Sequence, residues 1–413
     1  MTFKRELKES FIRWANFPRT KIPFWTLKKL KNYKMHTVGS KGSWADFLMY
    51  ITRDMSLSPT LHERVSEGSF ANLMSMWAQN YAENLPFIRN GNGVQVVLPE
   101  NPKQQTYAQL TVRPPVLEIE KEFSTLDVPF EVQKTVKVKY PPSGSAVVVG
   151  RGPSLFEHGH LQTLAEARQK GDYTGIVVAS DGGLIPCLEA GVIPEAVVTV
   201  DGAPIIKKWF EHPLVKQYGH RIKWVTTVTV NHEVFLAAHA AGLDIYWFNP
   251  MFDDWRQNES WTKIQKLMST TIFAPNGVPN ANAGGNAGAF AWITAMAIFK
   301  RSPVALIGID FGYPEGTPLE QTHYFNQMLK EAKGDVSIIR QSYKQFYHPT
   351  FKTRAYVDLV FYHYRQAFLE MQMETQLWYR LYDGTINCTE GGTLFGHLIT
   401  CMPFDQFLKE HKK

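Results

Sequence analysis

The segment AVVVGRGPSL, residues 146–155, is an apolar β-branched run that ends at two glycines and a proline. β-Branched residues favour strands, and proline is favoured at the start of a helix because no N–H donor is needed there. The segment therefore predicts a buried strand that enters a helix through a tight turn at Gly150 and Gly152. Such a turn can direct unpaired N–H groups and a helix dipole toward an anion, most simply a phosphate. An ordinary glycine turn has a similar sequence, so the neighbouring segments must decide between the two.

Four further apolar runs each end at a polar or acidic residue: 175–180 before Asp181, 196–200 before Asp201, 223–230 before Asn231, and 304–309 before Asp310. Residues 243–249 are a candidate for one more strand, and helical patterns such as 160–170 and 233–242 lie between the runs. Apolar runs without alternation are typical of parallel strands buried on both faces. We therefore expect a Rossmann-like α/β fold, with a mostly parallel sheet, helices on both faces, and helical N-terminal and C-terminal regions. Ligands of such sheets bind beyond the carboxyl ends of the strands, where Gly152, Asp181, Asp201 and Asp310 should gather.

Changes in composition divide the 413 residues into four regions: a basic aromatic arm at 1–42, a helical region with proline-rich connections at 43–140, the sheet domain at 141–315, and a helical C-terminal region at 316–413. A short edge strand is expected at 136–138. The apolar segment 287–299 is too short to span a bilayer and is better interpreted as a packed helix.

The arm is strongly basic. Residues 1–41 contain eleven Lys or Arg against two Glu, a net of +9, so the rest of the chain carries −3 of the total +6. Aromatic residues lie among these cations, a mixture that suits peripheral contact with an anionic surface. The alternative is a solvated arm whose aromatic side chains dock on the protein itself, because Pro18 and Pro23 interrupt any continuous amphipathic helix.

The three cysteines, Cys187, Cys388 and Cys401, lack the spacing of a zinc site or a disulfide framework. A reducing, cytoplasmic location is therefore expected. Residues 1–9 are charged and lead into no cleavage site, so no secretory leader is expected either.

A second candidate anion site is the loop PNGVPNANAGGNAG at 275–288, just before an apolar helix. Its backbone donors and the amides of Asn282 and Asn286 would lie at a helix start, where they could bind an anion. A flexible connection would have a similar composition. Two such loops facing one crevice would suit a nucleotide with several phosphates.

Asp181, Asp201 and Asp310 are candidate magnesium ligands or ribose partners, because carboxylates at strand ends can hold a cation that also binds phosphates. Each could instead cap a helix. Asp201 is the strongest candidate, since Gly202 beside it leaves room for a ligand. His323, Tyr324 and His348 follow the last predicted strand and could act as acid, base or phosphate ligand, although a lone histidine is more often structural.

Several enzyme classes are excluded or disfavoured by missing motifs. The chain has no Gly-Lys-Ser/Thr of a P-loop kinase, no Gly-x-Ser-x-Gly hydrolase elbow and no His-Glu-x-x-His zinc pair. The third glycine of the dinucleotide fingerprint is replaced by Leu155, which disfavours an oxidoreductase.

Five segments in order resemble the MptE-like domain, which is named for archaeal 6-hydroxymethylpterin diphosphokinase: GRGPSL at 150–155, the run 176–201, GGNAGAFAWITAMAIF at 284–299, LIGIDFGY at 306–313 and NCTEGG at 387–392. The same segments are similar to the core of Maf-type flagellin glycosyltransferases and of bacterial sialyltransferases. The match covers residues 145–315 well and the tail more loosely.

The resemblance implies a nucleotide-dependent transferase with Gly150, Gly152, Pro153 and Ser154 at the donor phosphates. It further implies Asp201 near the ribose or a metal, Gly285 and Asn286 lining the crevice, and Asp310 after the last strand. Together with the residue patterns, the expected catalytic set is Asp201, Asp310 and His323, with Asp181 at the nucleotide and Asp201 as the metal ligand.

Two reactions and one non-catalytic role remain open. A diphosphokinase would transfer pyrophosphate from ATP, with Mg²⁺, to a hydroxymethylpterin. A glycosyltransferase would transfer sugar from a CMP-type donor to a small-molecule, glycan or protein acceptor, and the long flanks, including NYAENLPFI at 80–88, resemble Maf-type proteins more closely. The third interpretation is a nucleotide-binding docking protein without catalysis.

Overall fold

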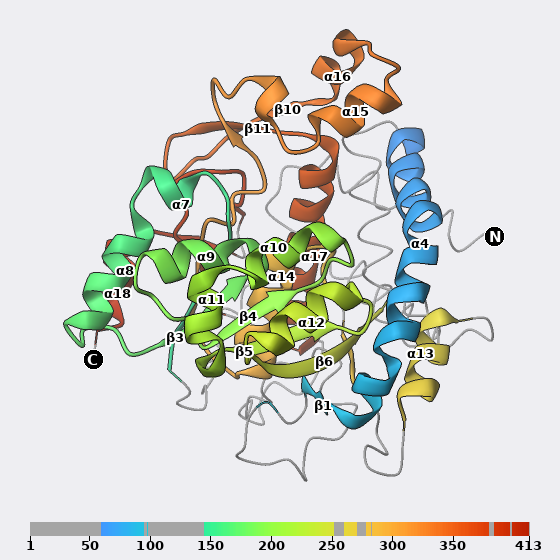
Figure 1. Cartoon of the computed structure of the whole chain (residues 1–413). Helices are drawn as coiled ribbons and strands as arrows, with labels where there is room; N and C mark the ends of the chain where they lie inside the picture. Colours follow the sequence, from blue (N-terminus) through green and yellow to red (C-terminus); the bar gives the residue numbers. More distant parts are fainter. Residues whose placement is uncertain are drawn as a thin grey trace.

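The computed structural model of the chain describes residues 59–94, 97, 144–251, 260–270, 278–281, 283–379, 384–396 and 399–412, whose arrangement is drawn in Figure 1. The predictions for the basic arm at 1–42 and for an edge strand at 136–138 fall outside the described residues. Within the described residues, no helix is both long and apolar enough to cross a membrane.

The main sheet contains ten strands in the described part of the chain. They are β1 (Asn92–Gly93), β2 (Ala146–Val149), β3 (Ile176–Ser180), β4 (Ala196–Thr199), β5 (Lys223–Thr227), β6 (Asp244–Pro250), β7 (Asn280–Ala281), β8 (Val304–Ile307), β12 (Thr385–Asn387) and β13 (Thr400–Cys401). Their order is β1-β6-β5-β4-β3-β2-β8-β12-β13, with β7 beside β6, and every pair is parallel. The predicted Rossmann-like parallel sheet is confirmed.

The chain order reverses between β2 and β8. From β2 the chain passes outward through β3, β4, β5 and β6, and it then returns to place β8 on the other side of β2. A crevice at the carboxyl ends is expected at this switch point, because the connections leave the two strands in opposite directions. The loops at Gly150 and Asp310 follow these two strands.

Helices cover both faces of the sheet (Figure 1). On one face are α8 (His160–Gln169), α9 (Asp181–Glu189), α10 (Lys207–Phe210), α11 (Pro213–Tyr218), α12 (His232–Ala240) and α18 (Phe404–Glu410). On the other are α14 (Ala287–Ile293), the π-helical turn η6 (Thr294–Ile298) that continues it, and α17 (Leu359–Tyr379). The long α4 (Pro59–Asn90) packs against α12 and against α13 (Trp261–Ser269).

Successive strand residues face opposite layers, as the period of two requires. Val148, Val178 and Val198 pack in the cluster that contains α14 residues, whereas Val147 and Val177 pack with α8 and α18 on the other face. All five side chains are fully buried. Each such valine contributes roughly 1.5–3 kcal/mol of hydrophobic stabilisation, which explains why the strands read as continuous apolar runs.

A small lobe rises above the carboxyl edge and forms the top of Figure 1. This upper lobe consists of β9 (Tyr313–Pro314), β10 (Lys344–Tyr347), β11 (Arg354–Val357), α15 (Phe325–Glu331) and α16 (Val336–Ser342). Its three strands pair antiparallel in the order β10-β11-β9. Four short helical segments lie in the connections of the described chain. They are α7 (Ser154–Glu157), η4 (Pro204–Ile206), η5 (Gly219–Arg221) and η7 (Leu319–Gln321), the last of which precedes α15.

The C-terminal region is more than helical. Besides α17 and α18, it supplies β12 and β13, which extend the main sheet beyond β8. These strands are three and two residues long, too short to give a periodic signal in the sequence. The predicted packed helix at 287–299 corresponds to α14 and η6, whose side chains are mostly buried in the core.

Candidate functional site at the carboxyl edge

The glycine turn after β2 packs directly against the loop after β8. The Gly150 amide donates to the Ile307 carbonyl at 2.9 Å, and the Gly152 amide donates to the Gly308 carbonyl at 2.8 Å. A Cβ at Gly150 would lie 2.1 Å from the Gly308 oxygen, and one at Gly152 would lie 1.8 Å from Oδ2 of Asp310. The glycines are therefore required by this close packing of two loops.

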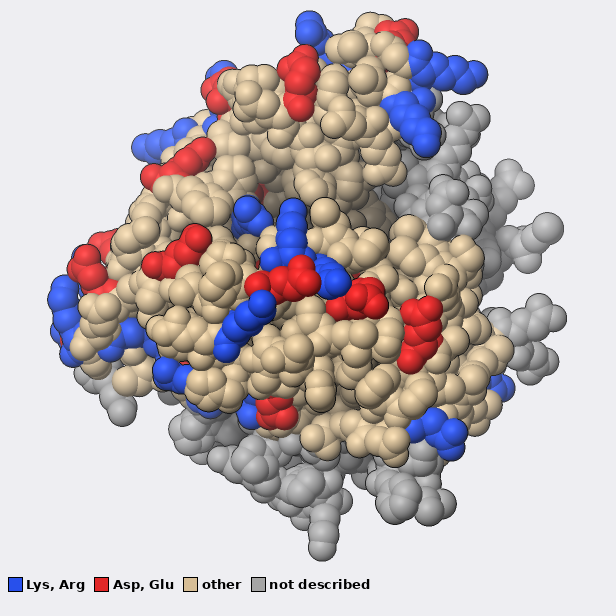
Figure 2. All heavy atoms as spheres, in the orientation of Figure 1, with Lys and Arg blue, Asp and Glu red and all other residues tan. Residues whose placement is uncertain are grey.

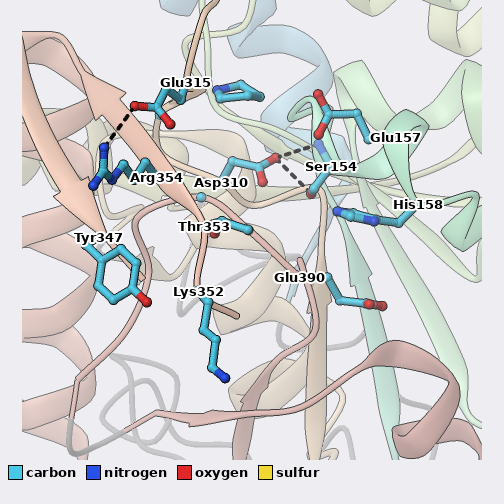
Figure 3. A pocket seen from close by; sticks show the side chains of 14 residues that line it. Ser154, Glu157, His158, Asp310, Glu315, Tyr347, Lys352, Thr353, Arg354 and Glu390 are labelled. Atoms are coloured by element: carbon cyan, nitrogen blue, oxygen red, sulfur yellow. Dashed lines mark hydrogen bonds and ion pairs between the residues drawn. The ribbon is translucent and has the colours of Figure 1, made fainter. Parts of the chain in front are cut away.

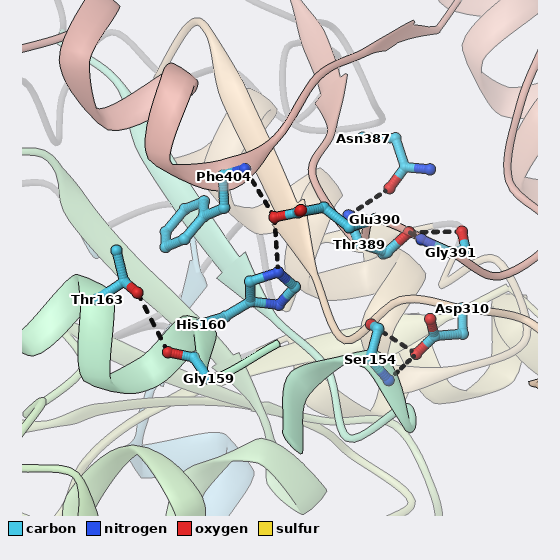
Figure 4. Close-up of polar contacts among 10 residues, drawn as sticks. All are labelled: Ser154, Gly159, His160, Thr163, Asp310, Asn387, Thr389, Glu390, Gly391 and Phe404. Atoms are coloured by element: carbon cyan, nitrogen blue, oxygen red, sulfur yellow. Dashed lines mark hydrogen bonds and ion pairs between the residues drawn. The ribbon is translucent and has the colours of Figure 1, made fainter. Parts of the chain in front are cut away.

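Ser154 begins α7 and is bound to Asp310. Oδ2 of Asp310 accepts from the Ser154 hydroxyl at 3.0 Å and from its amide at 3.3 Å (Figure 4). Pro153 is the N-cap residue, and α7 is only four residues long. The expected free N–H groups and helix dipole are therefore largely absent: three amides of the turn donate within the protein, and a buried carboxylate occupies the helix start. The Arg151 amide has no partner among the described residues.

Asp310 sits in surroundings that disfavour its charge. It is only 4% exposed, and burial raises its pKa to about 7 against the two hydrogen bonds from Ser154, which lower it. A desolvated carboxyl group near neutrality can accept or donate a proton. Asp310 thus has the electrostatic properties of a proton-transfer residue, although Ser154 already occupies one of its oxygens.

Asp181 and Asp201 lie at the ends of β3 and β4. Oδ1 of Asp181 accepts from the Gly182 amide at 2.7 Å, and Oδ1 of Asp201 accepts from the Ala203 amide at 2.9 Å. Burial, aided by the nearby charge of Asp201, raises the pKa of Asp181 to about 7. Desolvation also raises the pKa of Asp201, whose residue remains exposed. Of the three aspartates expected to gather at one sheet edge, Asp181 and Asp201 are close enough for their charges to interact.

His323 reaches this edge from the upper lobe. Desolvation raises the pKa values of Asp201 and Asp358, and the charge interaction of each with His323 partly offsets this rise. The backbone amide of His323 donates to the Tyr313 hydroxyl at 2.9 Å, and that hydroxyl donates to Oδ2 of Asp358 at 2.7 Å. The imidazole itself is exposed and lies edge-on to Tyr324, with ring centroids 4.6 Å apart. A buried network thus fixes the backbone while the ring stays open to solvent.

The glycine–asparagine loop meets the same group through Tyr364 of α17. A Cβ at Gly285 would lie 3.2 Å from Cε1 of Tyr364, and Tyr364 shares a hydrogen bond with Tyr324. The charge of Asp201 raises the pKa of Tyr364, after the larger effect of burial. The fold therefore groups Gly285 with Asp201 and His323.

Asn286 has a structural role within this loop. Its Oδ1 accepts from the Ala289 amide at 2.9 Å and caps α14, while Nδ2 donates to the Gly284 carbonyl at 3.2 Å. Both ends of the amide are thus engaged within the loop. The backbone start of α14 still faces the carboxyl edge, because helices that connect parallel strands run antiparallel to them.

Three or more His, Cys, Asp or Glu side chains do not gather into a metal-binding group anywhere in the described residues. Asp181 and Asp201 supply two carboxylates close enough for charge interaction. Mg²⁺ is commonly held by one or two carboxylates together with substrate phosphates and water, so these two residues fit a cation that arrives with a phosphorylated donor.

The switch point itself contains a pocket of about 540 Å³, shown in Figure 3. We name it the switch-point pocket; its lining residues are Ser154, Glu157, His158, Asp310, Gly312, Pro314, Glu315, Tyr347, Lys352, Thr353, Arg354, Glu390, Gly391 and Gly392. The upper lobe supplies one wall and α7 with the loop after β12 supplies the other. The structure thus divides the expected site: Ser154 and Asp310 line this pocket, whereas Asp181, Asp201, Gly285 and His323 lie around the edge beyond the glycine turn.

Several residues of this region were not expected from the sequence, among them Tyr313, Asp358, Tyr364 and Glu390. Asp358 precedes a long helix and accepts from the Phe361 amide at 2.8 Å, the spacing of a helix cap, which was a readable signal. The tyrosines come from segments whose approach to the sheet edge depends on tertiary packing alone. His348 is fully buried, and burial lowers its pKa to about 4, so the structural interpretation fits it better than acid–base chemistry.

Residues 121–316 match the family described as 6-hydroxymethylpterin diphosphokinase MptE-like. This part of the chain is an MptE-like domain. It contains the glycine turn, Asp181, Asp201, Gly285 and Asp310, whereas His323 and the wall residues 347–354 and 390–392 lie beyond the match.

One solved structure similar to this chain is the Maf glycosyltransferase from Magnetospirillum magneticum AMB-1, with 11% identity and a TM-score of 0.41. The similarity covers 66% of this chain and 38% of that one, so the chain spans about two-fifths of that protein's length. No curated protein matches the chain. The match supports a transferase-type family for residues 121–316.

Proposed function

We propose that this protein is a nucleotide-dependent transferase that carries out the reaction for which its family is named, transfer of pyrophosphate from ATP to a hydroxymethylpterin-type acceptor. The observation that carries the proposal is the convergence of Asp201 and His323 at the carboxyl edge of an MptE-like domain. The donor would lie across this edge, with its phosphates over the turn at Arg151 and toward Gly285.

The exposed guanidinium and free amide of Arg151 are suitable phosphate donors. The aliphatic part of its side chain lies over Gly182, whose Cβ would be 3.3 Å away, and its guanidinium is 5.9 Å from the Trp209 ring. These contacts hold the Arg151 side chain against the start of α9, at Gly182 next to Asp181. Figure 2 shows a hollow between the upper lobe and the sheet domain, with mixed basic and acidic side chains on its rim.

In the proposed reaction the acceptor hydroxyl loses its proton to His323 while its oxygen attacks the β-phosphorus of ATP. The bond between this phosphorus and the oxygen bridging to the α-phosphate breaks, and AMP leaves with that electron pair. Asp201 would orient the ribose or, with Asp181, hold Mg²⁺, which when bound offsets negative charge on the phosphates. Catalysis consists chiefly of alignment and charge stabilisation.

A second candidate is glycosyl transfer from a CMP-type sugar. It is favoured by one observation: His323, Tyr324 and Tyr364 complete the edge from outside residues 121–316, so the matched domain alone does not contain the candidate base. In this reaction the acceptor oxygen displaces CMP from the anomeric carbon, and His323 again takes the proton. The acceptor would be a small molecule, a glycan or a protein.

Thermal unfolding with ATP, CMP and CMP-sugars, each with and without Mg²⁺, separates the candidates because a ligand that binds the native state raises the melting temperature. A rise with ATP that requires Mg²⁺ supports the diphosphokinase. A rise with cytidine nucleotides that needs no metal supports glycosyl transfer. Absence of any rise contradicts both.

Turnover then distinguishes an enzyme from a docking protein that only binds nucleotide. The expected result is AMP release from ATP that depends on a hydroxymethylpterin acceptor. Binding without acceptor-dependent release of AMP or CMP would contradict both transferase reactions. The variant Glu166→Gln should release product like the native chain, because Glu166 lies on α8 and forms only an exposed ion pair with Lys170.

A further inference from the structure

The switch-point pocket is separate from the edge where the proposed donor lies, and its walls carry opposite chemical character. In Figure 3, Glu157, His158 and Glu390 line one side, and Tyr347, Lys352 and Arg354 line the other. At about 540 Å³ the pocket falls in the size range of small-molecule sites.

The charges of the pocket disfavour a phosphorylated ligand. Arg354 forms an ion pair with Glu315 at 3.5 Å, which largely cancels both charges. Among the described residues, Glu157 and Lys352 have no ion-pair partner. Glu390 adds a further carboxylate, and Asp310 adds one when deprotonated. Acidic groups therefore outnumber the available cations, and a phosphate would meet net repulsion.

The acceptor groups are held in place by the surrounding structure. Oε1 of Glu390 accepts from the Phe404 amide at 3.1 Å and lies 3.3 Å from Nε2 of His160 (Figure 4). The backbone of Glu390 has φ of +58°, a conformation that non-glycine residues rarely adopt. Phe311 and Lys352, beside and within the lining, have φ of +44° and +57°. Such strain persists where surrounding structure enforces it, and it concentrates at ligand sites.

Two further groups are available for a ligand. The buried Oγ1 of Thr353 makes no hydrogen bond, and an unused buried hydroxyl is costly unless something pairs with it. Tyr347 is 54% exposed, so its ring presents a flat apolar surface at the pocket wall. The lining thus offers carboxylate acceptors, hydroxyl and ammonium donors, and one aromatic face.

We propose that the switch-point pocket binds a small, uncharged, hydroxyl-rich molecule of the carbohydrate class. Sugar hydroxyls both donate and accept, so they can pair with Glu157 and Glu390 on one wall and with Lys352 and Thr353 on the other. The apolar C–H face of a sugar ring suits the exposed ring of Tyr347. A neutral ligand also avoids the repulsion that an anion would meet. This inference does not depend on which reaction occurs at Asp201 and His323.

The test is saturation-transfer NMR on the full chain with glucose, galactose, mannose and N-acetylglucosamine, each at millimolar concentration, and with inorganic phosphate in place of a sugar. We expect saturation transfer to at least one of the four sugars, and no chemical-shift change of pocket residues with phosphate. No transfer to any of the four sugars would overturn the proposal.

Two variants locate the binding. Glu157→Gln removes a charged acceptor and should weaken sugar affinity roughly fivefold, and Tyr347→Ala should weaken it by roughly tenfold. Both residues are exposed, so the fold should survive, and Glu166→Gln is the control on the neighbouring helix.

Unchanged affinity in both variants would overturn the proposal by placing the sugar elsewhere. Displacement of bound sugar by ATP or CMP would also overturn it, since the pocket would then belong to the donor; failure of nucleotide binding alone would leave it intact.

Discussion

At the scale of single residues, the carboxyl edge is distinguished by carboxyl groups that are hard to ionise. Burial raises the pKa of Asp181 and of Asp310 to about 7 from the ordinary value of 3.8. In the unfolded chain both groups lose their protons at lower pH than in the native state. The native protein therefore binds more protons between about pH 4 and 7, and its stability falls as pH rises through this interval.

Asp310→Asn should remove one of these two contributions. The amide keeps an oxygen for Ser154 but does not ionise, so relative to the native chain the variant should gain stability, on the order of 2 kcal/mol, as pH rises from 4 to 7. Urea unfolding at a series of pH values measures the difference. Asp405→Asn is the control, because Lys409 lowers the pKa of that exposed group and it titrates below the interval. A difference between variant and native protein that stays constant with pH would refute the assignment.

His323 and Asp201 are expected to act in catalysis rather than in folding. His323→Gln removes the proposed base and should lower kcat by roughly 10²–10⁴-fold. Asp201→Asn should weaken donor binding more than His323→Gln does, since it alters the ribose or metal contact. Steady-state kinetics across pH, with melting temperatures to confirm the fold, measure both effects. Full activity of either variant would exclude that residue from the site.

At the scale of elements, the turn after β2 illustrates what sequence could and could not predict. The strand, the glycine turn and the following helix were all predictable from local composition, as were the polar residues at the ends of β3, β4 and β8. The partner of the turn was not, because Gly308 and Asp310 lie more than 150 residues away and fill the space where a ligand was expected. The same limit explains Tyr364 and Glu390, whose positions depend on how α17 and the tail pack.

Gly152→Ala tests the packing role of this turn. The added methyl would lie 1.8 Å from Oδ2 of Asp310 and 2.8 Å from the Gly308 oxygen, so the loops after β2 and β8 must separate. We expect destabilisation of roughly 1–3 kcal/mol. Gly396→Ala is the control, since its added methyl would meet only Leu369 at 3.9 Å. Denaturant unfolding of the two variants should differ; equal stability would contradict the tight loop contact.

At the scale of the whole molecule, the MptE-like domain is completed by chain from both sides of it. The tail contributes two strands and α18 to the core, and the upper lobe places His323 over the sheet edge. Phe407 of α18 is fully buried and packs in the cluster that holds Val147, Val177 and Ile307. The helical character of the tail was predictable from periodicity, but its membership in the main sheet was not, since β12 and β13 are recognisable only through their pairing.

Phe407→Ala should therefore destabilise the entire domain by roughly 3–5 kcal/mol. Leu267→Ala, at a side chain that is 66% exposed, should change stability by less than about 0.5 kcal/mol. Thermal and denaturant unfolding measure both. If the Phe407 variant unfolded in two steps with an unchanged main transition, the tail would be an independent unit.

Binding of a nucleotide donor across the carboxyl edge is tested most directly by hydrogen–deuterium exchange of the full chain with and without ATP and Mg²⁺, and with CMP. We expect slower exchange in peptides covering residues 150–155, 181–184, 201–204 and 283–288 with at least one of these nucleotides. Unchanged exchange in all four segments with every nucleotide, or protection confined to the upper lobe, would contradict a donor site at this edge.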